Sequence, residues 1–248
     1  MYQSPAQRHS ARIKAEAELK QGRAISAPNS MHLQVSALMR DVERAKRAEN
    51  MATRRVMKRD ELLPRWMPTV EQYLASGEVH LNPVFAWCIV WLFDVGDFDK
   101  ALDWVDIAIE QRQTTPDSFK GTFASFTADT ILAWSENEFS LGHSVEPYFS
   151  RTFENIRDKW RLHEKISAKW FKFAGLMLLR DKDGKPRATA VSDIDVLEKA
   201  DELLAKAHAF NPKVGVMTMR GRITARIRSL TDNLTTTASQ ADAVEAED

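Results

Sequence analysis

The densest group of residues that could do chemistry is a run of carboxylates, Asp94, Asp97, Asp99, Asp103 and Asp106. A two-metal nuclease needs carboxylates that converge on divalent cations. The same spacing has a second interpretation, because Asp97 is placed to cap a helix and the later carboxylates recur on the polar face of that helix. Three candidate catalytic residues therefore stay open, with Mg²⁺ as their cofactor: Asp94, Asp97 and Asp103. If the capping interpretation holds, we expect no catalytic residue, metal or cofactor.

Other catalytic signatures are missing from this sequence. It contains no glycine-rich GK[ST] phosphate loop, so we expect no autonomous ATP hydrolysis. The six histidines are scattered, and the single cysteine, Cys88, lies on an apolar helix face, which disfavours a zinc site and a disulfide. No apolar run approaches the roughly 20 residues of a membrane span, and charges interrupt the first apolar run. We expect a soluble, cytoplasmic protein.

Charge is distributed unevenly although the chain carries 35 basic and 35 acidic residues. Residues 1–65 contain fourteen Lys or Arg against seven Asp or Glu, whereas residues 66–138 contain three against twelve. Residues 213–230 have five basic and no acidic residues, and residues 231–248 have five acidic and no basic ones. This pattern indicates separate surfaces for separate partners.

The basic residues near the start of the chain favour nucleic-acid binding, because Lys and Arg displace the counterions that condense on phosphates. The alternative is a solvated helix face with local ion pairs to Asp41, Glu43 or Glu49. The candidate DNA-binding residues are Arg8, Arg12, Lys14, Arg40, Arg44, Arg47, Arg54, Arg55, Lys58 and Arg59.

Two helices would carry these cations. Ser4-Pro5 is typical of a helix start, and this first helix would run to about Lys20. Residues 31–62 then predict one long, coiled-coil-like helix that needs the first helix, another subunit, or both as its partner. Its seam repeats at alternating steps of four and three, with Glu49 as the one polar position. The apolar members are Met31, Val35, Leu38, Val42, Ala45, Ala52 and Val56. Pro64 and Pro68 would end this helix, and Trp66 between them would dock onto the next domain.

The segment 85–113 predicts an antiparallel helical hairpin, with Gly96 ending one helix and Asp97 capping the next. Its spacing resembles a tetratricopeptide unit, and Ala200, Leu204 and Ala207 repeat part of it. Further helices are predicted at 119–134, 146–162, 163–180, 193–210 and 217–230, and no strand is expected. The predicted fold is all-α: basic N-terminal helices with the long helix, then a helical-hairpin domain and a disordered acidic tail.

These features divide the chain into three predicted regions. Residues 1–62 would form a basic region for DNA binding and oligomerisation, and residues 63–215 the helical-hairpin domain. Residues 216–248 would form a basic segment followed by the disordered tail.

Short motifs resemble the small terminase subunits of peduovirus-type tailed phages. They are Ser4-Pro5-Ala6-Gln7-Arg8-His9, then Glu61-Leu62-Leu63-Pro64-Arg65-Trp66-Met67-Pro68, the Asp94-x-Gly96-Asp97 turn, and residues 171–181. They occur in the family's order, and the resemblance spans roughly residues 1–215. The acidic end departs from the pattern, since relatives are expected to end rich in Lys and Arg.

The resemblance implies a DNA-packaging role in the cytoplasm of an infected bacterium, with no expected place in the mature virion. The partners implied are double-stranded viral DNA, the large ATPase and nuclease subunit, and further copies in a ring, with no membrane. The seam is the natural candidate for subunit packing. Members are often named endonuclease subunits, but cleavage is expected to belong to the large partner. The open alternatives are a protein-binding helical-repeat adaptor and a metal-dependent endonuclease.

Overall fold

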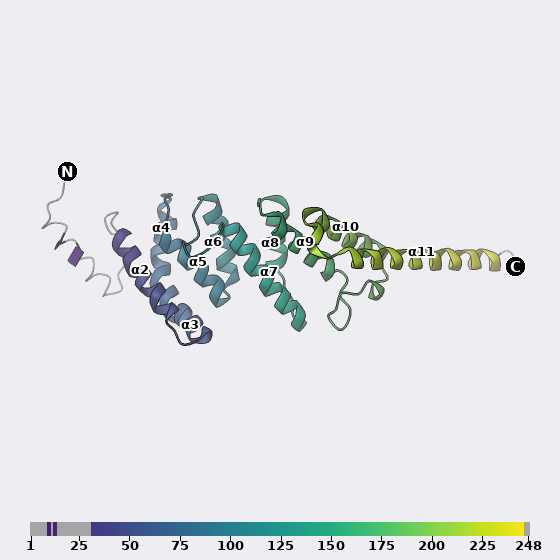
Figure 1. The fold of residues 1–248 in the computed structure, drawn as a ribbon, viewed down its shortest axis with the longest axis horizontal. Helices are drawn as coiled ribbons and strands as arrows, with labels where there is room; N and C mark the ends of the chain where they lie inside the picture. The colour runs from purple at the N-terminus through teal and green to yellow at the C-terminus, as the bar shows by residue number, and fades with distance from the viewer. Residues whose placement is uncertain (1–8, 11, 14–30, 246–248) are drawn as a thin grey trace. The chain divides into compact units, whose positions relative to one another are not determined.

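The structure is a computed structural model that describes residues 9–10, 12–13 and 31–245, with side chains described up to residue 233 (Figure 1). Within these ranges the regular elements are helices, and β-type pairing is limited to one isolated bridge between Arg180 and Pro186. The all-α prediction is confirmed. In this part of the chain, no helix has both the length and the apolar character that crossing a membrane requires.

Two compact units make up the chain, Met1–Phe126 and Thr127–Asp248. This division does not coincide with the three regions predicted from the sequence at 1–62, 63–215 and 216–248. Those regions were defined by charge and function, and they stay a prediction.

Helix α5 (Pro83–Val95) is the centre of the first unit, because every side chain from Val84 to Phe93 is buried. Burial of Cys88 on this helix raises the pKa of its thiol. The elements that pack most extensively against α5 are α2 (Met31–Lys46), α3 (Met51–Met57), the π-helical turn η2 (Lys58–Leu62), α4 (Leu63–Ser76) and α6 (Phe98–Glu110).

The predicted hairpin is formed by α5 and α6. The Asn82 side chain accepts hydrogen bonds from the amides of Val84 and Phe85, so α5 starts where Asn82-Pro83 predicts. Gly96 ends α5 with a φ of 86°, a left-handed conformation that favours glycine. Asp97 then caps α6 by accepting from the Lys100 amide at 3.3 Å. The likeness of this hairpin to a tetratricopeptide unit stays a prediction.

The expectation of one continuous helix over residues 31–62 is wrong. Helix α2 ends at Lys46, and α3 begins at Met51 after a short turn. The break has a local cause, since the Asn50 side chain accepts a hydrogen bond from the Thr53 amide at 2.8 Å and caps a new helix. The seam is divided by this turn: Leu38, Val42 and Ala45 are buried, whereas Ala52 and Val56 are exposed.

The two prolines do not end a helix as expected. Pro64 lies in the first turn of α4, where a missing amide hydrogen is tolerated, and Pro68 lies inside α4. Helix α4 ends instead at Gly77, which has a φ of 68°. Trp66 docks within the first unit, against α2, and is 2 % exposed.

The second unit contains the predicted helices with bounds shifted by a few residues. They are α7 (Phe123–Leu141, from Thr127 onward), α8 (Tyr148–Asp158), α9 (Glu164–Met177), α10 (Ile194–Phe210) and α11 (Met217–Glu245), with short 3₁₀ turns η3 (Ala188–Ala190) and η4 (Pro212–Val214). Helices α9 and α10 approach closely at Gly175, where an added Cβ would lie 2.9 Å from the Leu204 side chain. Ala200, Leu204 and Ala207 are buried in this core.

The tail differs from the expectation of disorder after residue 230. Helix α11 continues to Glu245.

Candidate nucleic-acid interface

Helix α2 presents one buried face and one exposed face. Leu38 and Val42 are buried, together with Ala37 and Ala45. Residues three and four apart lie on the same face of a helix. Burial of this stripe therefore directs the opposite face of α2 outward.

Asp41 holds α2 against α4. Its carboxylate is 6 % exposed and accepts a hydrogen bond from the Trp66 indole nitrogen at 2.9 Å. The guanidinium groups of Arg65 and Arg44 lie 3.3 and 3.5 Å from its oxygens. Because a buried carboxylate is costly unless it is paired, these contacts together fix the rotation of α2 about its axis.

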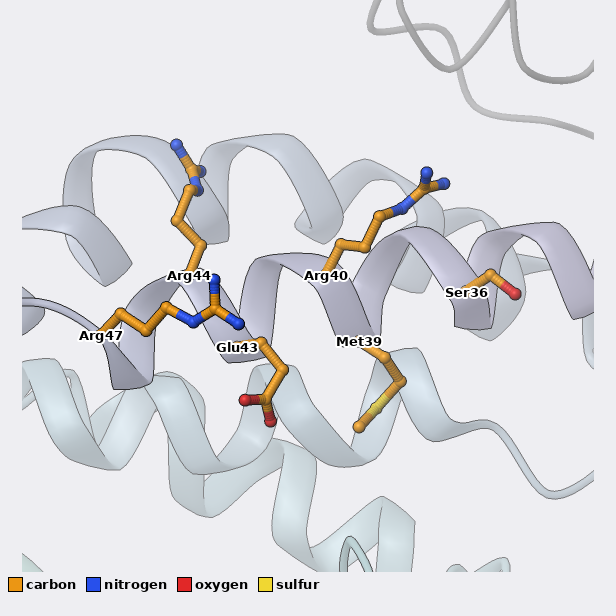
Figure 2. Close-up of a pocket in the computed structure, with 6 residues that line it drawn as sticks. All are labelled: Ser36, Met39, Arg40, Glu43, Arg44 and Arg47. Carbon is orange, nitrogen blue, oxygen red and sulfur yellow. The ribbon is translucent and has the colours of Figure 1, made fainter.

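The exposed face of α2 carries Arg40 and Arg44, and Arg47 directly follows the last residue of this helix. The Arg47 amide still donates to the Glu43 carbonyl oxygen at 3.2 Å, so the spacing of four and three residues places the three cations along one side. We call these three cations the arginine row. They line a shallow hollow of about 470 Å³ together with Ser36, Met39 and Glu43. In Figure 2 the side chains of Arg40 and Arg44 extend from the same side of α2, with Met39 and Glu43 directed to the other side.

The members of the arginine row differ in how far the protein itself satisfies them. Arg44 forms an ion pair with Glu61 at 2.9 Å, and half of its side chain is exposed. The guanidinium groups of Arg40 and Arg47 make no hydrogen bond or ion pair with the side chains that the structure describes. A hydrogen bond and an ion pair from Lys46 lower the pKa of Glu43, so this carboxylate stays ionised beside the row.

The candidate cations on α3 and η2 are engaged in the fold. The Arg54 guanidinium donates to the carbonyl oxygens of Ala45 and Lys46, both at 3.0 Å, and so caps the C-terminus of α2. Arg55 donates to the carbonyl oxygen of Asp94 at 2.7 Å, and Lys58 pairs with the Asp94 carboxylate. Arg54 therefore stabilises the end of α2, and Arg55 and Lys58 stabilise the packing around the end of α5.

The other candidates are placed as follows. Arg59 is exposed and paired with Asp60 at 2.7 Å, which raises the pKa of Arg59 and lowers that of Asp60. Arg12 is exposed, whereas Arg8 and Lys14 lie outside the described residues. A DNA-binding role for each of these cations stays a prediction.

The proposed oligomerisation seam is divided between the interior and the surface of the first unit. Leu38, Val42 and Ala45 pack inside the unit, and Met31 and Val35 are partly buried. A role for this seam in self-association stays a prediction, with Val56, 47 % exposed, on its outer part.

The carboxylate candidates are occupied locally. Asp94 pairs with Lys58, and Asp97 caps α6. Among the described residues, Asp94, Asp97 and Asp103 do not form a group that could hold a metal ion, and no other such group of His, Cys, Asp or Glu occurs there. The nuclease interpretation therefore finds no assembled metal site in this part of the chain.

A family model described as the phage small terminase subunit matches residues 35–165, which is more than half of the chain. The chain belongs to this family. The matched region contains the arginine row, the Asp41–Trp66 contact and the α5–α6 hairpin. The resemblance seen in the sequence is confirmed.

Two relatives of this small terminase subunit come from phages. The chain is 41 % identical over 194 residues to the "Probable terminase, endonuclease subunit" of Haemophilus phage HP1, covering 78 % of this chain and 69 % of that protein. It is 24 % identical over 204 residues to the "Terminase, endonuclease subunit" of Escherichia phage P2, covering 82 % and 80 %. No solved structure matches the chain.

Sequence reasoning missed the Asp41–Trp66 contact. The sequence feature that could have predicted it is the position of Asp41, three residues after Leu38 and therefore on the same buried face of the helix. Such a position predicts a buried carboxylate that needs a donor, and Trp66 in the Leu62-Leu63-Pro64-Arg65-Trp66 motif is one.

Proposed function

We propose that this small terminase subunit recognises viral DNA at the packaging site and brings it to the large ATPase and nuclease subunit in the cytoplasm of the infected bacterium. The arginine row on α2 is the DNA-contacting surface of the described part of the chain. The observation that carries the proposal is the presence of three arginines along the exposed side of α2 and at its C-terminal end, on a helix that the Asp41–Trp66 contact holds in a fixed orientation.

The physical basis is electrostatic. Two of the three guanidinium groups have no hydrogen-bonding partner among the described side chains, so binding a phosphate breaks no contact within the protein. Arginine forms paired hydrogen bonds with phosphate oxygens, and each phosphate contact releases condensed counterions from DNA. Over three contacts this predicts steeply salt-dependent binding.

The test is the salt dependence of duplex binding by the full chain, measured by fluorescence anisotropy. If each arginine makes one phosphate contact, the triple variant Arg40→Ala/Arg44→Ala/Arg47→Ala lowers the slope of log K against log salt by up to about 2.7 units. Affinity falls for all sequences, because phosphate contacts carry no base readout. Circular dichroism and thermal unfolding confirm that the variant folds.

A matched control removes three exposed cations from the second unit, in the variant Lys159→Ala/Arg161→Ala/Lys182→Ala. Its net charge equals that of the arginine-row variant, so a general loss of charge would affect both equally. A slope that stays unchanged when the arginine row is removed would overturn the assignment. Absence of salt-sensitive DNA binding in the unaltered chain would favour the protein-binding adaptor instead.

The proposal includes assembly into a homo-oligomeric ring. Light scattering of the chain, with and without a short duplex at low and moderate salt, measures the native mass. A single large species that binds DNA in a salt-sensitive way is the expected result. A monomer would contradict the ring.

We assign DNA cleavage to the large subunit. Support for this part of the proposal is that Asp94 and Asp97 serve in an ion pair and a helix cap. The names of the HP1 and P2 relatives keep the alternative of an intrinsic endonuclease open to experiment. Nicking of supercoiled plasmid by the isolated chain with Mg²⁺ or Mn²⁺, lost in a folded Asp97→Ala variant, would overturn the assignment.

A further inference from the structure

The second unit contains a hollow that the proposed DNA recognition does not use. It has a volume of about 490 Å³ and lies between α7, α9 and η4. Its apolar lining comes from Leu132, Ala133, Phe173, Leu176 and Val214. We call it the lysine groove, because four lysines lie around it: Lys165, Lys169, Lys172 and Lys213.

The lysines of the groove are available to different degrees. Lys172 donates to the Val214 carbonyl oxygen at 2.9 Å and holds η4 against α9. The other three are exposed, and their ammonium groups make no hydrogen bond or ion pair with the described side chains. Asp129 and Glu136 of α7 also line the groove, leaving it with a net positive charge.

We propose that the lysine groove receives residues 242–248 of a second copy of this chain. This segment has the sequence DAVEAED, with four carboxylates, no cation and small apolar residues between the charges. Its carboxylates complement Lys165, Lys169 and Lys213, and its alanine and valine side chains complement the apolar lining. The interaction is therefore a contact between copies in which charge supplies the specificity.

The length of α11 is the reason for assigning a second copy. The groove includes Lys213 and Val214, which lie just before the start of α11 at Met217. A helix rises about 1.5 Å per residue, so Glu245 lies about 42 Å along the axis from that start. Figure 1 shows α11 as one continuous helix that extends past α10. Residues 242–245 of one copy, the described part of this segment, are thus held away from their own groove.

The composition of the groove favours an acidic peptide over DNA. Duplex DNA presents phosphates on its outside, and the apolar side chains between the lysines cannot form hydrogen bonds or ion pairs with these phosphates. Asp129 and Glu136 would repel a continuous phosphate backbone, whereas a peptide can place its few carboxylates beside the lysines alone. The proposal does not depend on DNA binding by the arginine row.

The experiment is zero-length cross-linking of carboxylates to amines in the full chain, followed by peptide mass spectrometry. A groove variant carries Lys165→Gln/Lys169→Gln/Lys213→Gln, and a segment variant carries Asp242→Asn/Glu245→Gln/Glu247→Gln/Asp248→Asn. In a mixture of the two, co-expressed, the intact groove and the intact segment belong to different copies. A cross-link between them is therefore intermolecular by design.

We expect cross-links from residues 242–248 to Lys165, Lys169 or Lys213 in the unaltered protein, none in either variant alone, and their return on co-expression. They should decrease at 1 M salt, where the Debye length falls to about 3 Å. Lys159 and Lys182, exposed lysines elsewhere in the same unit, measure the non-specific background.

Three results would overturn the proposal. Cross-links in the unaltered protein that do not return on co-expression would place the contact within one copy. Groove cross-links no more frequent than those to Lys159 and Lys182 would show that there is no docking. A groove variant that lowers the DNA salt slope while the arginine row is intact would make the groove a phosphate site. Because the cross-linking uses protein without DNA, its failure is distinguishable from failure of DNA binding.

Discussion

Each compact unit carries three cations at the same spacing along one helical stretch. Arg40 and Arg44 lie on α2 with Arg47 directly after its end, and Lys165, Lys169 and Lys172 lie on α9. In both stretches the spacing places the cations along one face. The surroundings differ: the arginine row lines an open hollow with Glu43, and Arg44 also pairs with Glu61 and Asp41, whereas the lysines surround an apolar groove with two carboxylates.

The difference teaches that cation spacing alone does not identify a partner. A guanidinium group can form two parallel hydrogen bonds to a phosphate, whereas an ammonium group is a compact point charge, so the proposed partners differ as well. Each row also depends on a buried tryptophan for its orientation, Trp66 beneath α2 and Trp170 in α9. The two supports can be removed separately, which allows the comparison to be tested.

The largest effect is expected from Trp170→Ala. Trp170 is fully buried, stacks on Phe149 with ring centroids 5.0 Å apart, and donates to the Ala128 carbonyl oxygen. Its removal should cost the second unit about 3–5 kcal/mol. Hydrogen exchange should show loss of protection in α8, α9 and α10, with α5 of the first unit unaffected. Replacing the more exposed Phe210 with alanine is the control, and equal loss in α5 would show that the supports are not separate.

A smaller loss of stability, confined to the first unit, is expected from Asp41→Ala. The Trp66 indole N–H would be left buried without its acceptor, at a cost of about 1–3 kcal/mol. Urea unfolding of the variant measures this loss. Asp60→Ala is the matched control, because Asp60 is an exposed carboxylate paired with its neighbour Arg59. Equal stability of the two variants would show that Asp41 does not anchor α2.

Arg54→Ala separates structural arginines from DNA-contacting ones. Loss of its two hydrogen bonds to carbonyl oxygens at the end of α2 should destabilise the first unit by about 1 kcal/mol. Its effect on the DNA salt slope should be smaller than that of Arg40→Ala, which is expected to be about 0.9 unit. Thermal unfolding and anisotropy titrations on the same samples test both parts. If Arg54→Ala lowers the DNA salt slope more than Arg40→Ala does, Arg54 contacts DNA and the structural assignment is wrong.

The smallest effect is expected from Glu43→Gln, which removes a negative charge beside the arginine row and should tighten DNA binding slightly. The pKa of Glu43 is lowered by its hydrogen bond with Lys46, so protonation produces the same gain only below the usual range for glutamate. In the unaltered chain, anisotropy titrations over decreasing pH should therefore show the increase in DNA affinity only at pH values below the usual pKa range of glutamate. In the variant it should be absent, and an identical pH profile in both would contradict the assignment.

Local signals predicted the hairpin because they lie next to the elements that they delimit. Asn82-Pro83 and Gly96-Asp97 cap their helices through residues at most three positions away. The long helix was mispredicted because the apolar period resumes in phase at Ala52 after polar Glu49, although the Asn50 cap starts a new helix there.

The residue types of the candidate site could be predicted, but not which cations are free. Arg55 and Lys58 are engaged by Asp94, which lies more than thirty residues later in the chain. Such partners are set by the packing of α3 against α5, and no local pattern in the sequence specifies that packing. The arginine row could be identified as a candidate interface only after the structure showed that Arg54, Arg55 and Lys58 bind groups within the protein.

The burial of Cys88 gives this protein an internal reporter of unfolding. It is the single cysteine of the chain, it lies at the centre of α5, and burial keeps its thiol protonated. Since the thiolate is the reactive form, alkylating reagents can modify Cys88 only when the first unit opens. The labelling rate of the unaltered chain therefore measures how often that unit opens, and it can be followed with and without added DNA and over a range of protein concentrations without introducing a probe.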